Sequence, residues 1–211
     1  MCFFRNPVEN LSSFRYHFRV KQNWEITEDI SNRQSKLEES GYTAYCLRTR
    51  TGWECDLARN LNYLNPSVLA LPFLKVSHKS TKGVKSTELR LVLPSYVFLF
   101  TPPEWDIWSI DRKFREGFSF VTNVNPEDIV LKGGDLRYAR WVFGSAGIIG
   151  MSRAIKVNGR VKIIDGPLLS LEGRIKEYSK KNRNCRVETV LFNRVIDVWL
   201  PFTYVEEIKE G

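Results

Sequence analysis

Histidine and cysteine are scarce in this 211-residue chain, and neither occurs in an arrangement that supports chemistry. The two histidines, His17 and His78, lie far apart and have no cysteine or aspartate beside them in a recognisable catalytic or metal-binding pattern. No two of the four cysteines have the two-residue separation of a zinc knuckle or a redox motif. We therefore expect reduced thiols, no metal, no cofactor and no enzymatic activity.

Long hydrophobic runs are also missing. The densest, from Tyr96 to Phe100, is far shorter than the roughly 20 residues that a membrane-spanning helix needs. The first residues show no basic segment followed by an apolar one, which is the pattern of a secretion signal. These absences predict a cytoplasmic protein without a membrane partner.

Positive charge is in excess and is concentrated in one region. The chain has 32 basic and 24 acidic residues, a formal net charge of +8 and a pI near 9.4. Between Arg153 and Arg186 there are ten basic and three acidic residues, whereas the remainder is almost neutral. A local surplus of this kind is typical of phosphate binding and favours a nucleic acid partner. A charged surface that only aids solubility is the alternative interpretation.

Apolar periodicity predicts an extension followed by a mixed unit. We expect residues 1–41 to form an N-terminal extension, partly disordered, with a weak helix from about Thr27 to Glu39. Alternating residues predict a strand at 43–49, and Thr51-Gly-Trp-Glu54 has the capping-box spacing that opens a helix. Strands near 71–77, 89–93 and 96–100, with helices from Pro102 and about Asp135, complete an α+β sandwich over residues 42–147.

Small residues from Gly144 to Gly147 mark the boundary of this unit, and we expect residues 148–157 to form a flexible linker. Five short segments with turn signals between them follow within residues 158–211. They lie near 161–164, 173–178, 185–192, 195–200 and 204–208. This is the pattern of a small five-stranded barrel.

The segment 161–175 carries a recognisable motif. A turn glycine, Gly166, stands beside Pro167, and a second glycine, Gly173, precedes the next strand. The segment resembles the KOW motif, and the resemblance implies an SH3-like β-barrel. Asn193 stands where many relatives carry a hairpin glycine, and asparagine tolerates a positive φ better than most residues.

With this motif near the C-terminus, two earlier segments become informative. Residues 45–54, and Leu93-Pro-Ser-Tyr-Val-Phe98, resemble the opening strand-turn-helix and the Phe-Pro-Gly-Tyr-Val signature of the NusG N-terminal (NGN) domain. Ser95 replaces the usual glycine and Leu93 the usual phenylalanine. The chain is thus similar to NusG-like transcription elongation factors over residues 43–208. Residues 135–141, 147–154 and 164–168 look most like LoaP-type specialised antiterminators.

The resemblance implies a monomeric factor that binds RNA polymerase through its NGN domain, suppresses pausing and promotes antitermination. In this family an exposed apolar depression receives the clamp helices of the largest polymerase subunit. The residues at matching positions are Tyr45, Trp53, Tyr96 and Phe98. A basic hairpin tip containing Lys79, Lys82 and Lys85 is expected either to approach non-template DNA or to remain solvated.

The KOW domain is expected to bind RNA, for example a leader hairpin, through the cations of its central turn and adjoining strands. These candidates are Arg174, Lys176, Lys180, Lys181, Arg183 and Arg186. The interpretation requires that acidic side chains do not neutralise them. A rival interpretation is a free-standing KOW protein that binds ribosomal RNA or acts in ribosome assembly.

Overall fold

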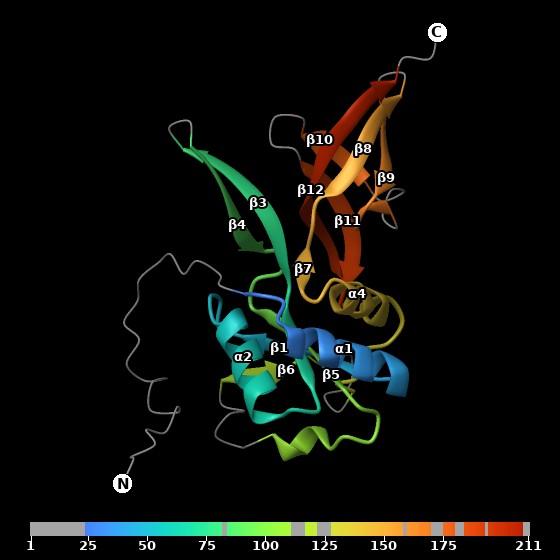
Figure 1. Ribbon diagram of the computed structural model, residues 1–211. Helices are drawn as coiled ribbons and strands as arrows, with labels where there is room; N and C mark the ends of the chain where they lie inside the picture. Colours follow the sequence, from blue (N-terminus) through green and yellow to red (C-terminus); the bar gives the residue numbers. More distant parts are fainter. Residues whose placement is uncertain are drawn as a thin grey trace.

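The computed structural model describes residues 24–81, 84–110, 117–121, 128–157, 160–169, 175–179, 184–192 and 194–208. Side chains are described for the same residues, apart from 78–81, 84–85, 156–157, 160 and 204–208. An N-terminal unit (residues 24–149) is followed by a C-terminal unit (residues 152–208), and the two lie against each other (Figure 1).

The N-terminal unit contains two sheets and several helices. Its elements in chain order are α1 (Glu28–Ser40), β1 (Thr43–Thr49), α2 (Glu54–Leu64), β2 (Leu69–Pro72), β3 (Leu74–Thr81), β4 (Val84–Leu91), β5 (Tyr96–Thr101), the 3-10 turn η2 (Ile107–Ser109), β6 (Phe118–Phe120), α4 (Gly133–Gly144) and β7 (Ile148–Ile149). The four-stranded sheet has the order β2-β5-β1-β6, and the three-stranded sheet has the order β4-β3-β7. This combination of helices with separate sheets confirms the predicted α+β class.

Apolar residues on both faces of β1 and β5 explain why this sheet is central. All residues of β5 after Tyr96 are buried, and β1 exposes only Arg48. Helix α4 packs on the face that carries Phe98 and Phe100, where ring centroids lie 5.9 Å from Tyr138 and 4.9 Å from Phe143, respectively. Such a layer of helix on sheet buries the apolar faces of both elements.

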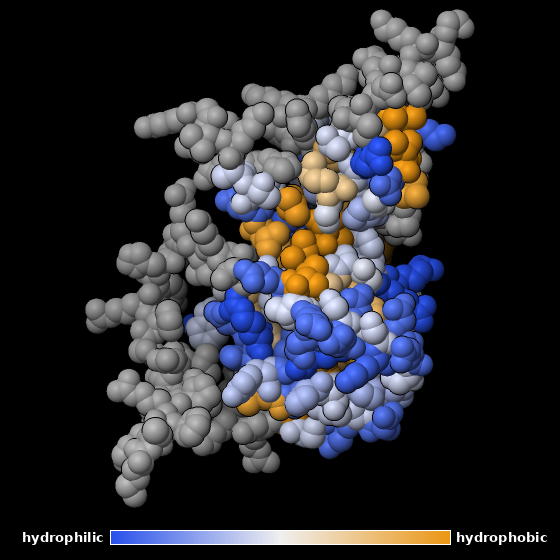
Figure 2. All heavy atoms as spheres, in the orientation of Figure 1, coloured by the Kyte–Doolittle hydropathy of each residue, from blue (hydrophilic) through white to orange (hydrophobic). Residues whose placement is uncertain are grey.

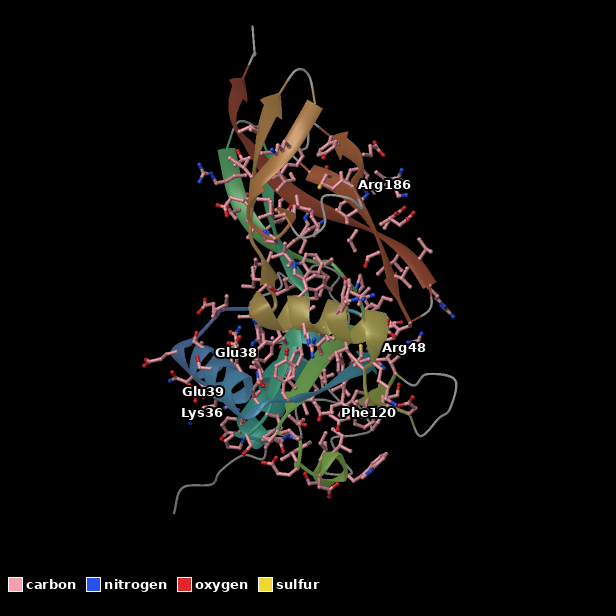
Figure 3. The ribbon with its side chains drawn as sticks, turned by 90° about the vertical axis from the view of Figure 1, so that its right-hand side faces the viewer. Lys36, Glu38, Glu39, Arg48, Phe120 and Arg186 are labelled. Carbon is pink, nitrogen blue, oxygen red and sulfur yellow. The ribbon has the colours of Figure 1, made fainter. Side chains whose placement is uncertain are left out.

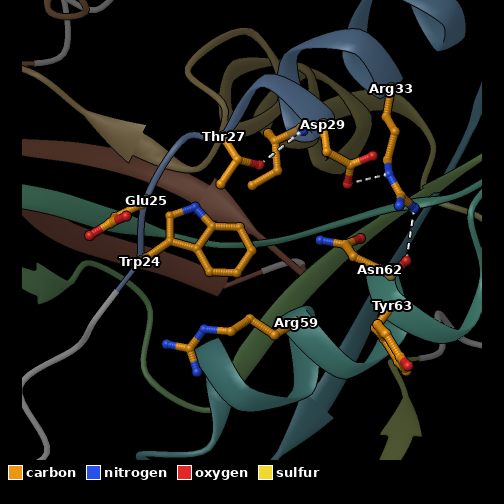
Figure 4. Close-up of a pocket in the computed structure, with 9 residues that line it drawn as sticks. Trp24, Glu25, Thr27, Asp29, Arg33, Arg59, Asn62 and Tyr63 are labelled. Carbon is orange, nitrogen blue, oxygen red and sulfur yellow. Dashed lines mark hydrogen bonds and ion pairs between the residues drawn. The ribbon is translucent and has the colours of Figure 1, made fainter.

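Helix α1 confirms the predicted helix and packs closely on the rest of the unit. The Thr27 hydroxyl accepts a hydrogen bond from the Ile30 N–H at 3.3 Å, which caps the first turn. The Arg33 guanidinium donates to three backbone carbonyls at the end of α2 and the loop after it, at 2.9 to 3.2 Å. Figure 4 shows the bond to Asn62. Trp24, Ile30 and Leu37 are buried, so residues 24–40 belong to the packed unit although an extension was expected there.

The helix expected after Pro102 is present only as the 3-10 turn η2 within the described residues. Asp106 caps this turn by accepting a hydrogen bond from the Trp108 N–H at 2.9 Å. The short edge strand β6, which pairs with β1, was not predicted, because three residues are too few to show a periodic pattern.

The C-terminal unit is a curled five-stranded sheet, compatible with the expected small barrel. Its strands are β8 (Ser152–Val157), β9 (Arg160–Asp165), β10 (Ile175–Ser179), β11 (Asn184–Leu191) and β12 (Arg194–Ile208), in the order β10-β11-β12-β8-β9. The last two predicted strands form one continuous strand, β12, which runs through Pro201 and then pairs in parallel with β8.

Residues 148–157, expected to form a linker, instead contribute β7 and β8 to two different sheets. Small residues in this segment and just before it reflect close packing. A Cβ atom on Gly147, whose φ is +81°, would lie 2.5 Å from the Pro72 carbonyl oxygen. Ser152 is fully buried, and its hydroxyl accepts a hydrogen bond from the Leu168 N–H at 3.0 Å. Figure 2 shows apolar residues gathered across the middle of the molecule, where the two units meet.

Candidate docking and nucleic-acid surfaces

The four candidate polymerase-contact residues differ in exposure. Phe98 is fully buried and Tyr45 is 7% exposed. Phe98 packs on Tyr138, and the Tyr45 ring lies 6.2 Å from the Phe120 ring. A buried ring cannot meet a partner in this conformation, so the structure corrects the expectation for these two residues and assigns them to the core. Periodicity alone could not separate core aromatics from surface ones.

Trp53 and Tyr96 are partly exposed and remain candidates. The Arg50 guanidinium lies 4.9 Å from the centroid of the Trp53 ring, in a cation–π arrangement on the surface. The Tyr96 ring lies 5.7 Å from the ring of Phe192, which belongs to the turn between β11 and β12. Tyr96 is therefore partly covered by the C-terminal unit.

A buried carboxylate joins the two segments that contain Trp53 and Tyr96. Glu54 is fully buried and accepts hydrogen bonds from the N–H groups of Gly52 at 2.8 Å and Ser95 at 2.6 Å. The hydroxyl groups of Thr51 and Ser95 are 2.5 Å apart. The expected capping box is thus wrong in detail, because Thr51 bonds to Ser95 and no side chain caps α2. The three residues Thr51, Glu54 and Ser95 form what we call the Glu54 clip.

In the C-terminal unit, acidic neighbours neutralise the two candidate cations whose side chains are described. The amine of Lys176 lies 3.2 Å from the Glu188 carboxylate. Arg186 lies 3.1 Å from Asp197 and 3.4 Å from a Glu177 oxygen. These contacts correct the expectation that Lys176 and Arg186 are free to bind phosphate, because charge alternation along one strand does not reveal the charges on its neighbours. The other four candidates, Arg174, Lys180, Lys181 and Arg183, lie outside the described residues.

The turn at Gly166 has a conformation and packing that favour glycine. Gly166 has a φ of +90°, and a Cβ atom there would lie 2.8 Å from the Cα of Ser152. Its N–H donates to the Asp165 carboxylate at 2.8 Å, and Leu168 beyond Pro167 is fully buried. Only glycine combines this φ with so close a backbone approach. Gly173 and Asn193 lie outside the described residues, and the positive φ in that hairpin falls on Phe192, at +52°.

The contact between the two units, which we call the seam, was not predicted. The Phe192 N–H donates to the Asp135 carboxylate at 2.8 Å, and the Lys75 amine donates to the Trp199 carbonyl oxygen. Burial and the neighbouring Arg90 guanidinium lower the pKa of Lys75. Hydrogen bonds between a side chain and a backbone group so distant in the chain leave no local pattern in a single sequence.

Cys46, Cys55 and Cys185 are buried, and burial raises the pKa of Cys55 and of Cys185 to about 12. In the described part of the chain, no group of three or more histidine, cysteine or acidic side chains is placed to hold a metal ion. The helices described there include none that is long and apolar enough to cross a membrane.

A cavity of about 410 Å³ lies between α1 and α2 (Figure 4). Several polar groups that line it are already used within the fold. Arg33 bonds to Asp29 and to the end of α2, and the Asn62 amide exchanges two hydrogen bonds with the Ala70 backbone at 2.6 and 2.9 Å. These bonds hold α1, α2 and β2 together, so we assign the cavity lining to the scaffold.

Comparison with solved protein structures finds a likeness in fold. A solved structure entitled "Domain interaction in Thermotoga maritima NusG" is similar to this chain, with 20% sequence identity and a TM-score of 0.42. The match covers 76% of this chain and 93% of that one. No protein family model matches the chain, and no curated protein sequence matches it.

Proposed function

We propose that this chain is a NusG-type transcription elongation factor that binds RNA polymerase through its N-terminal unit and RNA through its C-terminal unit, with Arg174, Lys180, Lys181 and Arg183 as the RNA contacts in place of the ion-paired Lys176 and Arg186. In this role it suppresses pausing and promotes antitermination, as the LoaP-type resemblance implies, on transcripts whose leader forms a hairpin. It acts as a cytoplasmic monomer and performs no catalysis.

The observation that carries this proposal is the way the two NGN-like segments come together. Residues 45–54 and 93–98 are distant in sequence, yet β1 and β5 pair in register, with Arg48 opposite Tyr96. The Glu54 clip then fixes the loop before α2 against the turn before β5. The segments that resemble one family domain thus form one substructure, which supports a shared role for them.

The partly exposed end of this substructure is the proposed polymerase contact. Trp53 with Arg50 presents a large ring and a positive charge next to the Glu54 clip. Tryptophan and arginine are the residues most often found at energetically dominant interface positions. Tyr96 adjoins this surface but is partly covered by Phe192, so Trp53 is the more informative residue for a test.

The test is capture of bacterial RNA polymerase by the purified chain and by two variants. Trp53→Ala should lose polymerase, because removing a dominant interface residue weakens binding by about 2 kcal/mol or more. The matched control is Tyr63→Ala, which removes a 79% exposed aromatic ring from α2. Capture of ribosomal particles instead of polymerase favours the rival ribosomal role. Equal polymerase capture by Trp53→Ala and the unmodified chain refutes the assigned surface.

A further inference from the structure

The cavity between α1 and α2 is large enough to hold more than water. Its volume of about 410 Å³ falls within the range of roughly 300–1,000 Å³ that is common for binding sites in proteins. The Trp24 ring lies on one side of it and α2 on the other (Figure 4). The buried side chain of Ile30 also lines it, so part of the cavity wall is apolar.

The cations that line this cavity are already paired, whereas one polar group is not. Arg33 contacts Asp29 at 2.8 Å, and Arg59 contacts Asp56 at 2.5 Å. An anionic ligand would therefore have to compete with acids of the fold. The buried Nε1–H of Trp24, in contrast, has no hydrogen-bond acceptor within the described residues. Because buried donors in proteins normally have an acceptor, this group favours an occupant that carries carbonyl oxygens, such as a peptide segment.

The rim of the cavity is apolar and acidic. Ile26 and Leu64 are exposed, and each adjoins a lining residue in the chain. Glu25, which projects outward beside Trp24 (Figure 4), and Glu28 are exposed as well, and neither has an ion pair within the described residues. We call Glu25 and Glu28 the rim acids. Such a surface suits a basic segment that carries large apolar side chains.

The chain has a segment of this kind directly before the cavity. Phe14-Arg-Tyr-His-Phe-Arg-Val-Lys21, which we call the alternating segment, places a large apolar residue at every second position, with arginine, histidine and lysine between them. It lies outside the described part of the structure. Phe18 is six residues before Trp24, a span of at most about 22 Å. So short a connection gives the segment a high effective concentration at the cavity.

We propose that the alternating segment docks in this cavity, with the Phe18 ring against Trp24 and Ile30. An extended segment carries its apolar side chains on one face and its cations on the other. The apolar face then fills the cavity, a carbonyl group of the segment accepts the Trp24 N–H, and the long cationic side chains reach the rim acids. This docking goes beyond the proposed function and does not depend on it.

The first test is photo-crosslinking within the full chain, with the variant Phe18→benzoylphenylalanine. After irradiation, mass spectrometry should find the group joined to residues 24–33 or 59–64. The matched control is Phe4→benzoylphenylalanine, which lies outside the alternating segment and should give at most a tenth of these products. Crosslinks of the Phe18 variant that fall mainly elsewhere in the chain contradict the docking. Crosslinked dimers identify a second copy as the occupant and contradict it as well.

The second test measures the anchor by hydrogen exchange in the full chain. Phe18→Ala should speed the amide exchange of the alternating segment and of residues 24–27 roughly tenfold, because an aromatic ring loses its burial. Phe4→Ala, the matched control, should leave these rates as they are. Equal rates in Phe18→Ala and the unmodified chain refute Phe18 as the anchor.

The third test removes the rim charges. The double variant Glu25→Gln, Glu28→Gln should speed exchange of the alternating segment severalfold in dilute buffer, and the difference should shrink near 1 M salt, where the Debye length is about 3 Å. The matched control is Glu38→Gln, Glu39→Gln, which removes two acids beside Lys36 at the other end of α1 (Figure 3). Equal effects of the two double variants contradict the rim contact. Because no polymerase is present, failure of these tests leaves the proposed function unaffected.

Discussion

Replacement of Glu54 provides a sharp test of how the N-terminal unit is assembled. The Glu54 carboxylate is fully buried and accepts N–H groups from Gly52 and Ser95, which belong to two different loops. Glu54→Ala leaves both donors without an acceptor. Glu54→Gln keeps one oxygen for one donor but turns an amide N–H₂ toward the other, so it should retain about half of the interaction.

The magnitude follows from the two hydrogen bonds. A hydrogen bond to a charged group contributes about 1.5–3 kcal/mol, so loss of both should cost about 3–6 kcal/mol in Glu54→Ala. Glu54→Gln should cost roughly half of that. With a urea dependence of about 2 kcal/mol per M, the midpoint of unfolding should fall by about 2 M for Glu54→Ala and by about 1 M for Glu54→Gln.

Urea unfolding followed by tryptophan fluorescence and by far-ultraviolet circular dichroism measures these shifts. The informative control is Asp56→Asn, which removes an exposed carboxylate two residues later in the first turn of α2. If Glu54 acted only on the helix dipole, both variants would cost at most about 1 kcal/mol. Equal, small shifts in Glu54→Ala and Asp56→Asn would therefore refute the clip.

Three further changes have defined outcomes. Ser95→Gly should stabilise the chain by up to about 1 kcal/mol in urea unfolding, because relief of the Ser95 φ of +72° outweighs the lost, exposed hydroxyl contact with Thr51; a lower midpoint contradicts this. Gly166→Ala should cost more than Gly41→Ala, since both have a positive φ and only Gly166 has a backbone atom within 3 Å of the added Cβ; equal melting temperatures would exclude the clash. Burial raises the pKa of Cys185 to about 12. The neutral buried thiol therefore contributes its full stabilisation of the folded state below about pH 8.5, and this stabilisation is lost as the pH rises toward 12. Between pH 9 and 11, the free energy of unfolding should therefore fall less steeply with pH in Cys185→Ala than in the unmodified chain, by about 1.4 kcal/mol per pH unit. Equal slopes in the two proteins would contradict this prediction.

The elements with a long periodic pattern could be predicted from sequence. Helix α2, strand β5 and the turn at Gly166 depend on residues close together in the chain, such as the Asn65-Pro66 stop and the glycine beside Pro167. Helix α1 was also predicted, but its packing was not. That packing includes long-range hydrogen bonds, from Arg33 to carbonyl groups some 30 residues away and from Gln34 to the Phe143 carbonyl oxygen.

The features that escaped prediction depend on contacts between distant residues. Ser152 looks like a linker residue in sequence because it is small and polar, whereas in the structure it is fully buried and its hydroxyl accepts the Leu168 N–H. The cations Lys176 and Arg186 look free until the register of β10, β11 and β12 places acids beside them.

In vitro transcription through an intrinsic terminator tests the proposed elongation role most directly. Purified chain is added to bacterial RNA polymerase on templates with and without a structured leader, and the fraction of full-length transcript is measured. We expect the chain to increase readthrough, and Trp53→Ala to abolish the increase while Tyr63→Ala preserves it. Readthrough that stays at its basal value on every template, although the chain is folded, contradicts the proposed function.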